Sequence, residues 1–447
     1  MDRFIDFDSD EIALVNGKEQ VSYRELFVRC QKKGGDLKSL GAEKGSIVSV
    51  EISNSIEFVV YYITCAIFDY CIVPINDLLS DDEKKYIIDD CNPAFIVKQG
   101  EISVNDATRK VDSDIYLICY TSGTTGSPKG VCHSLEALVA NVRSFNSLAG
   151  INSNTIMYHV LPMGYMAGFL NTILSPLCAH GKVVIGEQFS ARSIINFWPV
   201  ALENKCNTIW LTPTILSYLT KITRSESIIS KVRDSFSLLL IGTAPLLAPV
   251  RDAFEKKFNL KCTESYGMTE VLLVSANILH ADSSVGQLID LAEIENESGE
   301  LKIRTPNLFL GYYHQGKMSE AVAKGEYFCT GDLFSCDDKG NLYIEGRKKD
   351  LIIKGGKNIS AKYIEEVLVS HEEIIDAAVI GIPHSFWGEE IVAVIVSEGS
   401  LTEKAVFNYC SLFLSRDLLP SQVVFVKDFP RSSTGKINKS MLKEIYL

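Results

Sequence analysis

The sequence predicts an α/β protein: a large N-terminal domain of mainly parallel βαβ sheets with a small barrel-like β region, then a small α+β C-terminal domain. Three observations lead to this prediction. Helical patterns alternate with short β-rich runs up to Phe258. Short, glycine-punctuated segments typical of antiparallel hairpins begin at Gly299. The C-terminal part mixes helices and strands, which indicates a separate small unit.

The first part of the chain has the alternation that produces parallel sheets. Ser22 starts a helix as its cap, with Glu25 three residues on. The elements that follow are a strand over 47–52, a helix over 56–68, a strand over 71–75, a helix over 81–91, strands over 94–98 and 116–120, a helix from Leu135, strands over 182–186, 208–211 and 237–242, and a helix over 248–258. Such alternation predicts right-handed crossovers onto a mainly parallel sheet.

The later elements are shorter, and a boundary falls among them. We expect hairpin strands over 299–305, 340–346 and 350–359, then a helix over 361–368, strands over 376–382 and 390–397, a helix over 403–415 and a strand over 422–426. The charged, glycine-led segment 346–350 has the composition of an exposed linker. The sequence therefore predicts domains over 1–348 and 349–447, with the hinge at Lys349.

Composition excludes several classes of protein. The formal charge of −12, from 44 basic and 56 acidic residues, argues against nucleic-acid or anionic-membrane partners. The twelve cysteines contain no C-x-x-C pair, so we expect reduced core thiols in a cytoplasmic protein whose acidic N-terminus is no signal peptide. The uncharged stretch between Arg143 and Lys182 is interrupted by proline and glycine, which favours a buried strand and a buried helix over a membrane span.

One segment stands out chemically. The strand over 116–120 runs directly into Thr121–Gly130, which has three glycines, the hydroxyl side chains of Thr121, Ser122, Thr124 and Thr125, and Lys129. Glycines allow close backbone approach, and hydroxyls and lysine offer donors to phosphate oxygens. The segment is neither a Walker A loop nor a dinucleotide-binding loop. Without further motifs, a plain Gly/Ser/Thr surface loop is the alternative.

Residues 120–131 resemble the signature loop of the adenylate-forming superfamily, which includes acyl-CoA synthetases, adenylation domains of nonribosomal peptide synthetases and firefly luciferases. The family's other motifs have counterparts in the same order: 242–246, 265–270, 299–301 with 311–312, 330–333, 346–347 and 430–438. The resemblance extends from about Phe4 to Ile445, and its style is closest to acyl- and aryl-CoA ligases.

The resemblance implies ATP and Mg²⁺ as ligands and assigns roles residue by residue. Lys436, Arg347 and Thr121 are the expected catalytic residues, Glu270 the metal ligand, and Asp332 the partner of the ribose hydroxyls. The remaining nucleotide-binding residues are expected to be Ser122, Gly123, Thr124, Thr125, Gly126, Lys129, Gly242, Thr243, Ala244, Tyr266, Gly267, Met268 and Thr269. Within this set, the tyrosine lies along adenine and Thr269 meets the α-phosphate.

The implied activity is ATP-dependent conversion of a carboxylic acid to an acyl-adenylate with release of pyrophosphate, then transfer to the thiol of CoA. In the family, the mobile small domain swings about the hinge, so that Lys354, Gly355 and Gly356 reach the thiol tunnel. An acyl pocket is expected at Tyr165, Met166, Ala167 and Trp210. Because this stretch lacks the aspartate of amino-acid-activating members, we expect an apolar or aromatic acid.

Two alternatives remain from the sequence: transfer to a separate, phosphopantetheinylated acyl carrier protein, and a non-catalytic nucleotide-binding relative. The presence of Lys436, Glu270 and Asp332 weighs against the latter. The chain also departs from the family pattern. Ser134 and Leu135 replace a Thr-His pair, and His133 falls two residues before the expected position. Tyr165 replaces the pocket histidine, and Ala361 replaces a proline.

Overall fold

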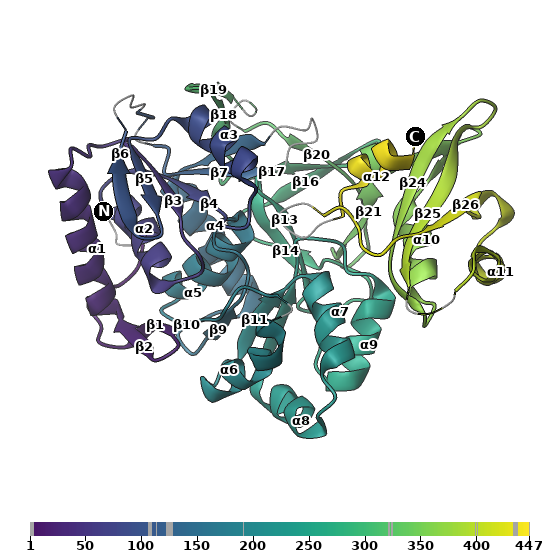
Figure 1. Ribbon diagram of the computed structural model, residues 1–447, viewed down its shortest axis with the longest axis horizontal. Helices are drawn as coiled ribbons and strands as arrows, with labels where there is room; N and C mark the ends of the chain where they lie inside the picture. The colour runs from purple at the N-terminus through teal and green to yellow at the C-terminus, as the bar shows by residue number, and fades with distance from the viewer. Residues whose placement is uncertain are drawn as a thin grey trace.

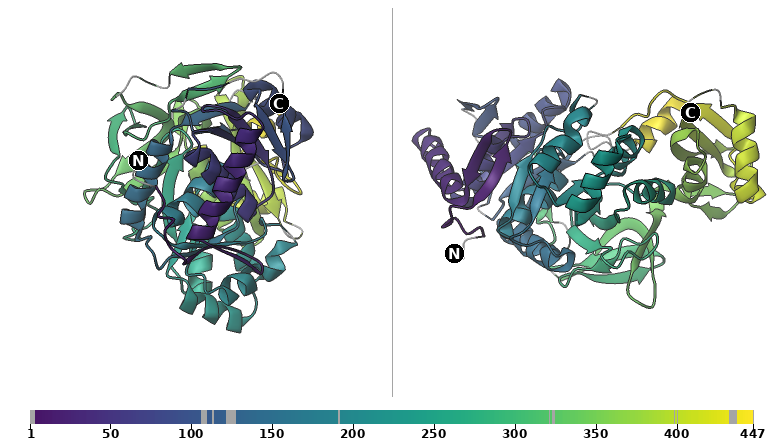
Figure 2. Two further views of the ribbon diagram at one scale, coloured as in Figure 1. Left: turned by 90° about the vertical axis from the view of Figure 1, so that its left-hand side faces the viewer. Right: turned by 90° about the horizontal axis from the view of Figure 1, so that it is seen from below.

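The computed structural model describes residues 4–105, 110–112, 114–121, 128–190, 192–320, 322, 325–397, 399, 401–431 and 437–446. Figure 1 shows a large N-terminal part and, at one end of it, a smaller C-terminal part; the view from below in Figure 2 separates the two again. The mixed α/β architecture predicted from the sequence is confirmed.

A nine-stranded sheet forms one half of the large part. Its central strands are parallel and lie in the order β1 (Ile12–Asn16), β10 (Lys182–Ile185), β9 (Ile156–His159), β11 (Thr208–Leu211), β12 (Leu238–Ile241) and β13 (Thr263–Met268). Antiparallel strands complete its edges: β2 (Glu19–Ser22) at one, β14 (Leu272–Ala276) and β15 (Gln287–Leu288) at the other. The carboxyl ends of β9, β11, β12 and β13 therefore meet along one edge.

An eight-stranded sheet forms the other half. Its parallel strands are β5 (Phe95–Lys98), β3 (Ile47–Glu51), β4 (Cys71–Ile75) and β7 (Leu117–Thr121). Antiparallel strands flank them: β6 (Glu101–Val104), and on the other side β8 (Lys129–His133), β18 (Gly311–His314) and β19 (Lys317–Glu320). Strand β8 was not predicted, because the segment was interpreted as the end of the loop.

Helices pack against both sheets. They are α1 (Tyr23–Ser39), α2 (Ile56–Ile67), α3 (Asp81–Cys91), α4 (Leu135–Ala149), the π-helix η1 (Ala167–Leu174), α5 (Ser175–Cys178), η2 (Ser193–Asn196), α6 (Phe197–Glu203), α7 (Pro213–Ile222), α8 (Glu226–Ser235) and α9 (Ala248–Phe258). The predicted cap is present, since the Ser22 side chain accepts from the Glu25 amide. The uncharged stretch forms β9 followed by η1, so the expected strand and helix are confirmed, although the π form was not predicted.

The hairpin region forms a four-stranded antiparallel sheet of β16 (Glu293–Glu297), β17 (Glu300–Arg304), β20 (Phe328–Cys336) and β21 (Leu342–Arg347). A short turn of helix, η3 (Lys348–Asp350), leads to the small part. There, β22 (Ile352–Lys354), β23 (Lys357–Ile359), β24 (Ile374–His384), β25 (Gly388–Ser397) and β26 (Gln422–Phe425) form one sheet, accompanied by α10 (Ala361–Val369), α11 (Glu403–Phe413), η4 (Arg416–Leu418) and α12 (Lys439–Tyr446).

The apolar clusters of the two parts are separate. Those of the large part contain no buried residue beyond Leu342, and those of the small part none before Ile352. All twelve cysteines lie in the described part of the chain, and no disulfide links any two of them. No helix among the described residues is long and apolar enough to cross a membrane.

Candidate active site

The two ends of the predicted phosphate loop are held side by side. Thr121 is the last residue of β7 and Lys129 the first of β8, and the two residues pair across the hairpin. The Lys129 side chain is exposed, with Nζ 5.4 Å from the centre of the Tyr312 ring. Five predicted loop residues lie outside the described residues: Ser122, Gly123, Thr124, Thr125 and Gly126. The predicted adenylation lysine, Lys436, lies outside them too.

The segment Gly242, Thr243 and Ala244 follows β12 at the carboxyl edge of the nine-stranded sheet. The Gly242 amide donates to the Leu211 carbonyl at 3.1 Å, which extends the pairing of β11 with β12. A Cβ at Gly242 would lie 2.8 Å from Ser265 Oγ, so only glycine fits there without movement. Thr243 has a φ of 72°, a left-handed conformation that is strained for a β-branched residue.

The motif 265–270 occupies the end of β13 and the turn into β14. Tyr266, Gly267 and Met268 belong to β13, and Thr269 and Glu270 to the turn. A contact from the other sheet fixes this turn: Nε2 of the buried His133, at the end of β8, lies 2.7 Å from the Thr269 carbonyl. Because a carbonyl oxygen only accepts, Nε2 carries the hydrogen. Burial lowers the pKa of His133 to about 4, which keeps the ring neutral.

The Glu270 carboxylate is hydrogen-bonded to Tyr312, a side chain that also contacts Lys129. The Tyr312 hydroxyl donates to Glu270 Oε1 at 3.1 Å, and the face of the same ring lies under Lys129. The Phe309 amide donates to the Glu270 carbonyl at 2.9 Å. One aromatic side chain from β18 thus connects the base of the phosphate loop with the predicted metal ligand.

Asp332 is the most buried carboxylate of the site. It lies on β20, is 3% exposed, and accepts from the Tyr266 hydroxyl at 2.6 Å and from Arg347 Nε at 2.9 Å. Burial and the neighbouring Asp332 raise the pKa of Tyr266 well above its usual value, so the hydroxyl stays a donor. Three predicted nucleotide residues from β13, β20 and β21 therefore form one hydrogen-bonded group.

The turn that presents Asp332 is tied to β17. The Gly331 amide, at a φ of 74°, donates to Glu300 Oε1 at 3.1 Å, and Lys348 Nζ lies 2.9 Å from Glu300 Oε2. Glu300 thereby connects the segment of β20 around Asp332 to Lys348, the residue before the predicted hinge, Lys349. Lys349 itself is exposed within η3.

The predicted acyl and thiol residues lie on different elements. Tyr165 and Met166 precede η1, Ala167 is its first residue, and η1 contacts both β9 and Trp210's strand β11. Lys354, Gly355 and Gly356 lie at the β22–β23 turn of the small part, where the Gly355 amide donates to the Trp387 carbonyl at 2.7 Å.

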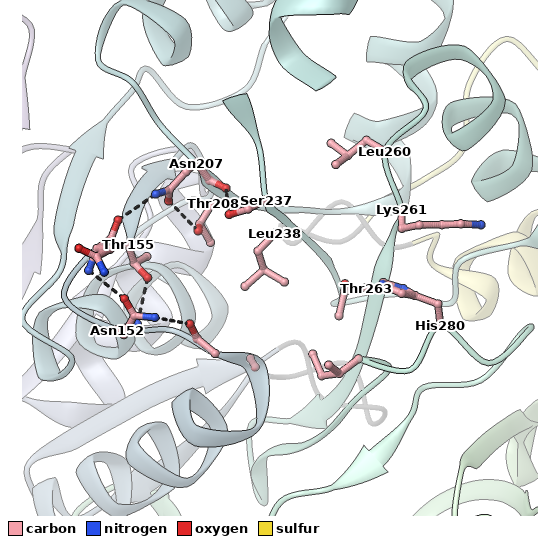
Figure 3. A pocket seen from close by; sticks show the side chains of 14 residues that line it. Asn152, Thr155, Asn207, Thr208, Ser237, Leu238, Leu260, Lys261, Thr263 and His280 are labelled. Atoms are coloured by element: carbon pink, nitrogen blue, oxygen red, sulfur yellow. Dashed lines mark hydrogen bonds between the residues drawn. The ribbon is translucent and has the colours of Figure 1, made fainter. Parts of the chain in front are cut away.

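A surface pocket of about 340 Å³ lies elsewhere (Figure 3). Its lining includes Thr208, Leu238 and Thr263, the first residues of β11, β12 and β13. The pocket is therefore at the amino edge of the nine-stranded sheet, whereas ligands of open α/β sheets bind at the carboxyl ends of the strands. None of the predicted site residues lines it.

Comparison with known proteins decides the family. The model of the "AMP-binding enzyme" family matches residues 2–113 and 103–313, and that of the "AMP-binding enzyme C-terminal domain" matches residues 363–436. The chain belongs to the AMP-binding enzyme family. This assignment confirms the adenylate-forming resemblance inferred from the motifs.

Relatives of this AMP-binding enzyme are similar over nearly their whole length. A long-chain-fatty-acid–CoA ligase of Mycobacterium tuberculosis is 27% identical over 96% of this chain and 93% of the relative. A 2-succinylbenzoate–CoA ligase of Bacillus cereus is 25% identical over 98% and 96%. Among solved structures, ATP-bound MatB from Rhodopseudomonas palustris superposes with a TM-score of 0.87 at 25% identity, covering 98% of this chain and 96% of that one.

Sequence reasoning missed two residues of this AMP-binding enzyme's site. Tyr312 was noted only as part of a motif, and His133 only as a histidine displaced from its family position. Both act through contacts between segments far apart in the sequence, Tyr312 to Glu270 and His133 to Thr269. The available signals were a histidine, His133, three residues after the end of the phosphate motif and a tyrosine, Tyr312, within another family motif.

Proposed function

We propose that the chain activates a carboxylic acid with ATP and transfers the acyl group to CoA. The supporting observation is the hydrogen-bonded group of Tyr266, Asp332 and Arg347 beside the β13–β14 turn, where Tyr312 contacts both Glu270 and Lys129. The relatives named as CoA ligases support CoA as the thiol.

In the first step, a carboxylate oxygen of the acid attacks the α-phosphorus of ATP. A bond from this oxygen to phosphorus forms, the bond to the bridging oxygen breaks, and pyrophosphate leaves with the electron pair. In the second step, the thiolate attacks the acyl carbonyl carbon and AMP leaves. Both steps concentrate negative charge, so fixed positive charge and oriented donors lower the barrier.

Each predicted nucleotide-binding residue would bind a different part of ATP. Asp332 would accept hydrogen bonds from the vicinal hydroxyls of ribose, and a buried carboxylate suits that role because its bonds are charge-assisted. Tyr266 would lie along adenine, and Arg347 would contact the nucleotide. The loop from Thr121 to Lys129 would bind the phosphates. Lys436 would add a positive charge from the small domain.

Glu270 fits a magnesium ligand. Mg²⁺ is commonly held by one or two carboxylates together with substrate phosphates. Among the described residues, no group of three His, Cys, Asp or Glu side chains could hold a metal without such help. Only one oxygen of Glu270 accepts from Tyr312, so the other can face the ion. Bound there with ATP, Mg²⁺ would supply charge that stabilises the pyrophosphate leaving group.

The domain boundary belongs to the same proposal. Domains over 1–348 and 349–447, joined at Lys349, would allow the small domain to present Lys436 for the first step. Rotation would then replace it with the Lys354–Gly356 turn for the second step. The separate apolar clusters of the two parts support such a boundary.

The test is product analysis with ATP, Mg²⁺, CoA and a panel of short, fatty, aryl and amino acids. The proposal expects AMP and an acyl-CoA thioester from one class of acid. If a thioester forms only with a phosphopantetheinylated carrier protein, that protein and not CoA is the acceptor. ATP binding without AMP formation for any acid would overturn the proposal in favour of a non-catalytic nucleotide-binding protein. Because ATP and CoA are cytoplasmic metabolites, we place the reaction in the cytoplasm.

A further inference from the structure

The segment 161–164 connects β9 with the predicted acyl-pocket residues Tyr165 and Met166. It begins two residues after the end of β9 and forms a bend and a turn ahead of η1. A turn has no ladder of backbone hydrogen bonds to a neighbouring strand, so its position depends on bonds from side chains around it. The side chains that bond to this turn come from the eight-stranded half of the large part.

Asn54 holds this segment through both ends of its side-chain amide. It lies three residues beyond β3, where its Nδ2 donates to the Leu161 carbonyl at 2.8 Å and its Oδ1 accepts from the Met163 amide at 2.9 Å. A carbonyl only accepts and a backbone amide only donates, so these partners fix the orientation of the Asn54 amide. One side chain thereby pairs with the segment at two points.

Two further contacts leave the segment little freedom. The hydroxyl of the buried Tyr62, on α2, donates to the Met163 carbonyl at 2.7 Å, and the Tyr62 ring stacks on Phe169 of η1 with centroids 3.7 Å apart. A Cβ at Gly164 would lie 2.6 Å from the backbone nitrogen of Asn76, so the two backbones are in close contact. Asn76 is the first residue after β4. The segment is thus held from α2 and from the ends of β3 and β4.

The same sheet edge carries the predicted phosphate loop. Strands β3, β4 and β7 are parallel neighbours, so their carboxyl ends lie side by side. Thr121 is the last residue of β7 and the first of the loop. The bonds of Asn54 therefore fix the pocket segment, which follows a strand of the other sheet, relative to the base of the phosphate loop. Adenylation depends on this placement, because a carboxylate oxygen must approach the α-phosphorus in line.

We propose that Asn54 is a positioning residue for the acid substrate. It acts through the backbone of Leu161 and Met163, which leads directly into the predicted acyl pocket. The bound acid is thereby kept aligned with the phosphate loop. This inference rests on the proposed acid-activating function and deepens it, because it names what aligns the two substrates. The alternative is an asparagine that only stabilises the fold, and the two roles differ in their kinetic effect.

The test compares Asn54→Ala with wild type in acid-dependent pyrophosphate release and in ATP titration calorimetry. The acid is the one that wild type uses best among butanoate, octanoate, benzoate and phenylacetate. A misplaced pocket should lower the kcat/KM for this acid about tenfold or more, whereas the dissociation constant of ATP should stay within about twofold of wild type. A loss of ATP affinity as large as the loss in kcat/KM for the acid would overturn the inference.

Asn277→Ala is the matched control. The Asn277 side chain makes the same pair of bonds, because its Nδ2 donates to the Ala281 carbonyl at 2.8 Å and its Oδ1 accepts from the Ala281 amide at 2.9 Å. Asn277 is buried and follows β14, and the loop after it borders the surface pocket at the amino edge of the sheet. Both variants lose two hydrogen bonds, but only Asn54→Ala should lose activity with the acid. An equal fall of kcat/KM in both variants contradicts the inference.

A second pair keeps the test decisive if Asn54→Ala does not fold. Tyr62→Phe retains the ring stacked on Phe169 and removes only the bond to the Met163 carbonyl, so kcat/KM for the acid should fall about 2- to 10-fold. Tyr116→Phe is its control, because the Tyr116 hydroxyl is also buried but donates to the Tyr62 carbonyl at 2.8 Å. Unchanged kcat/KM in Tyr62→Phe, or an equal fall in both variants of this pair, overturns the inference. No pyrophosphate release by wild type with any acid refutes the proposed function instead.

Discussion

The Tyr266 hydroxyl donates a 2.6 Å hydrogen bond to Asp332 Oδ2, which joins the nine-stranded sheet to the four-stranded sheet at the predicted nucleotide site. The other carboxylate oxygen accepts from Arg347 Nε. Tyr266 and Arg347, which belong to two other sequence motifs, thus both bind the carboxylate of Asp332. A change of the Asp332 carboxylate should therefore affect ATP binding.

Asp332→Asn should weaken ATP binding. The amide keeps the shape of the side chain but loses the charge that strengthens its bonds to Arg347 and to the ribose hydroxyls. Hydrogen bonds to charged groups contribute about 1.5–3 kcal/mol, so the dissociation constant of ATP should rise about 10- to 100-fold. Titration calorimetry measures this directly. Asp338→Asn is the control, because Asp338 is exposed in the loop that follows β20. Equal ATP affinities of wild type, Asp332→Asn and Asp338→Asn would contradict the role of Asp332 in ATP binding.

Tyr312→Phe should raise the Mg²⁺ concentration needed for half-maximal activity. The phenyl ring still lies under Lys129, but Glu270 loses its donor and with it a fixed orientation. Loss of one such bond is expected to change the requirement about 2- to 10-fold. Tyr313→Phe is the control, because the Tyr313 hydroxyl faces Cys91 at 3.5 Å. Identical magnesium dependence in both variants would show that Tyr312 does not position Glu270.

We expect the hydrogen bond of Glu300 with the Gly331 amide to contribute more to stability and ATP affinity than its ion pair with Lys348. Glu300→Ala removes the acceptor of that amide and should lower both stability and ATP affinity, each by about 1–2 kcal/mol. Glu300→Gln keeps an acceptor and should cost much less. Lys348→Gln should have little effect, because solvent screens an exposed ion pair and its contribution to stability is small. The measurements are thermal unfolding and ATP titration. A large loss in Lys348→Gln contradicts this ranking.

Glu264 predicts a pH dependence of stability. Burial raises its pKa from 4.5 to about 7, although Arg251, 3.9 Å away, and Lys362 lower it; Asp282 and Glu366 raise it further. Between these two values the folded chain binds more protons than the unfolded chain, so stability falls as pH rises through this window. Glu264→Gln stays neutral and should be more stable than wild type above pH 7 by about 1–3 kcal/mol.

Thermal unfolding of both proteins across this pH range measures the difference. Glu295→Gln serves as the control, because that side chain is exposed. Stability curves of wild type and Glu264→Gln that run parallel from pH 4.5 to 8 would disprove a raised pKa at this position.

Lys436→Ala should separate the two half-reactions. Loss of a fixed positive charge at the transferring phosphorus should reduce acyl-adenylate formation on the order of 100-fold or more. Thioester formation from synthetic acyl-adenylate and CoA should be largely retained, because in the proposed mechanism a different segment of the small domain serves this step. The exposed Lys427→Ala is the control. Equal loss of both half-reactions contradicts the two-pose account.

Local rules predicted much of the fold. The cap at Ser22 and the helix over Asp81–Cys91 follow from short-range chemistry, and the helix has the predicted bounds. Strand β8 was not predicted, because Lys129–His133 becomes a strand by pairing with β7 on one side and β18 on the other. Similarly, the polar segment of β13 is extended because β12 and β14 flank it.

The family resemblance predicted which residues form the site but not their contacts with one another. It implied that Tyr266 and Asp332 both touch the nucleotide, yet their mutual bond joins residues 66 positions apart. The contact of His133 Nε2 with the Thr269 carbonyl likewise joins residues 136 positions apart. Short-range chemistry is therefore readable from the chain, whereas the pairing of polar groups across sheets requires the structure.

Incorporation of labelled pyrophosphate into ATP tests the central claim most directly, because it reports the reversible first step without any thiol. The account predicts exchange that requires a carboxylic acid and Mg²⁺, proceeds without CoA, and is lost in Asp332→Asn at limiting ATP. Exchange that is absent with every acid while ATP binds, or formation of ADP in place of AMP, would contradict it.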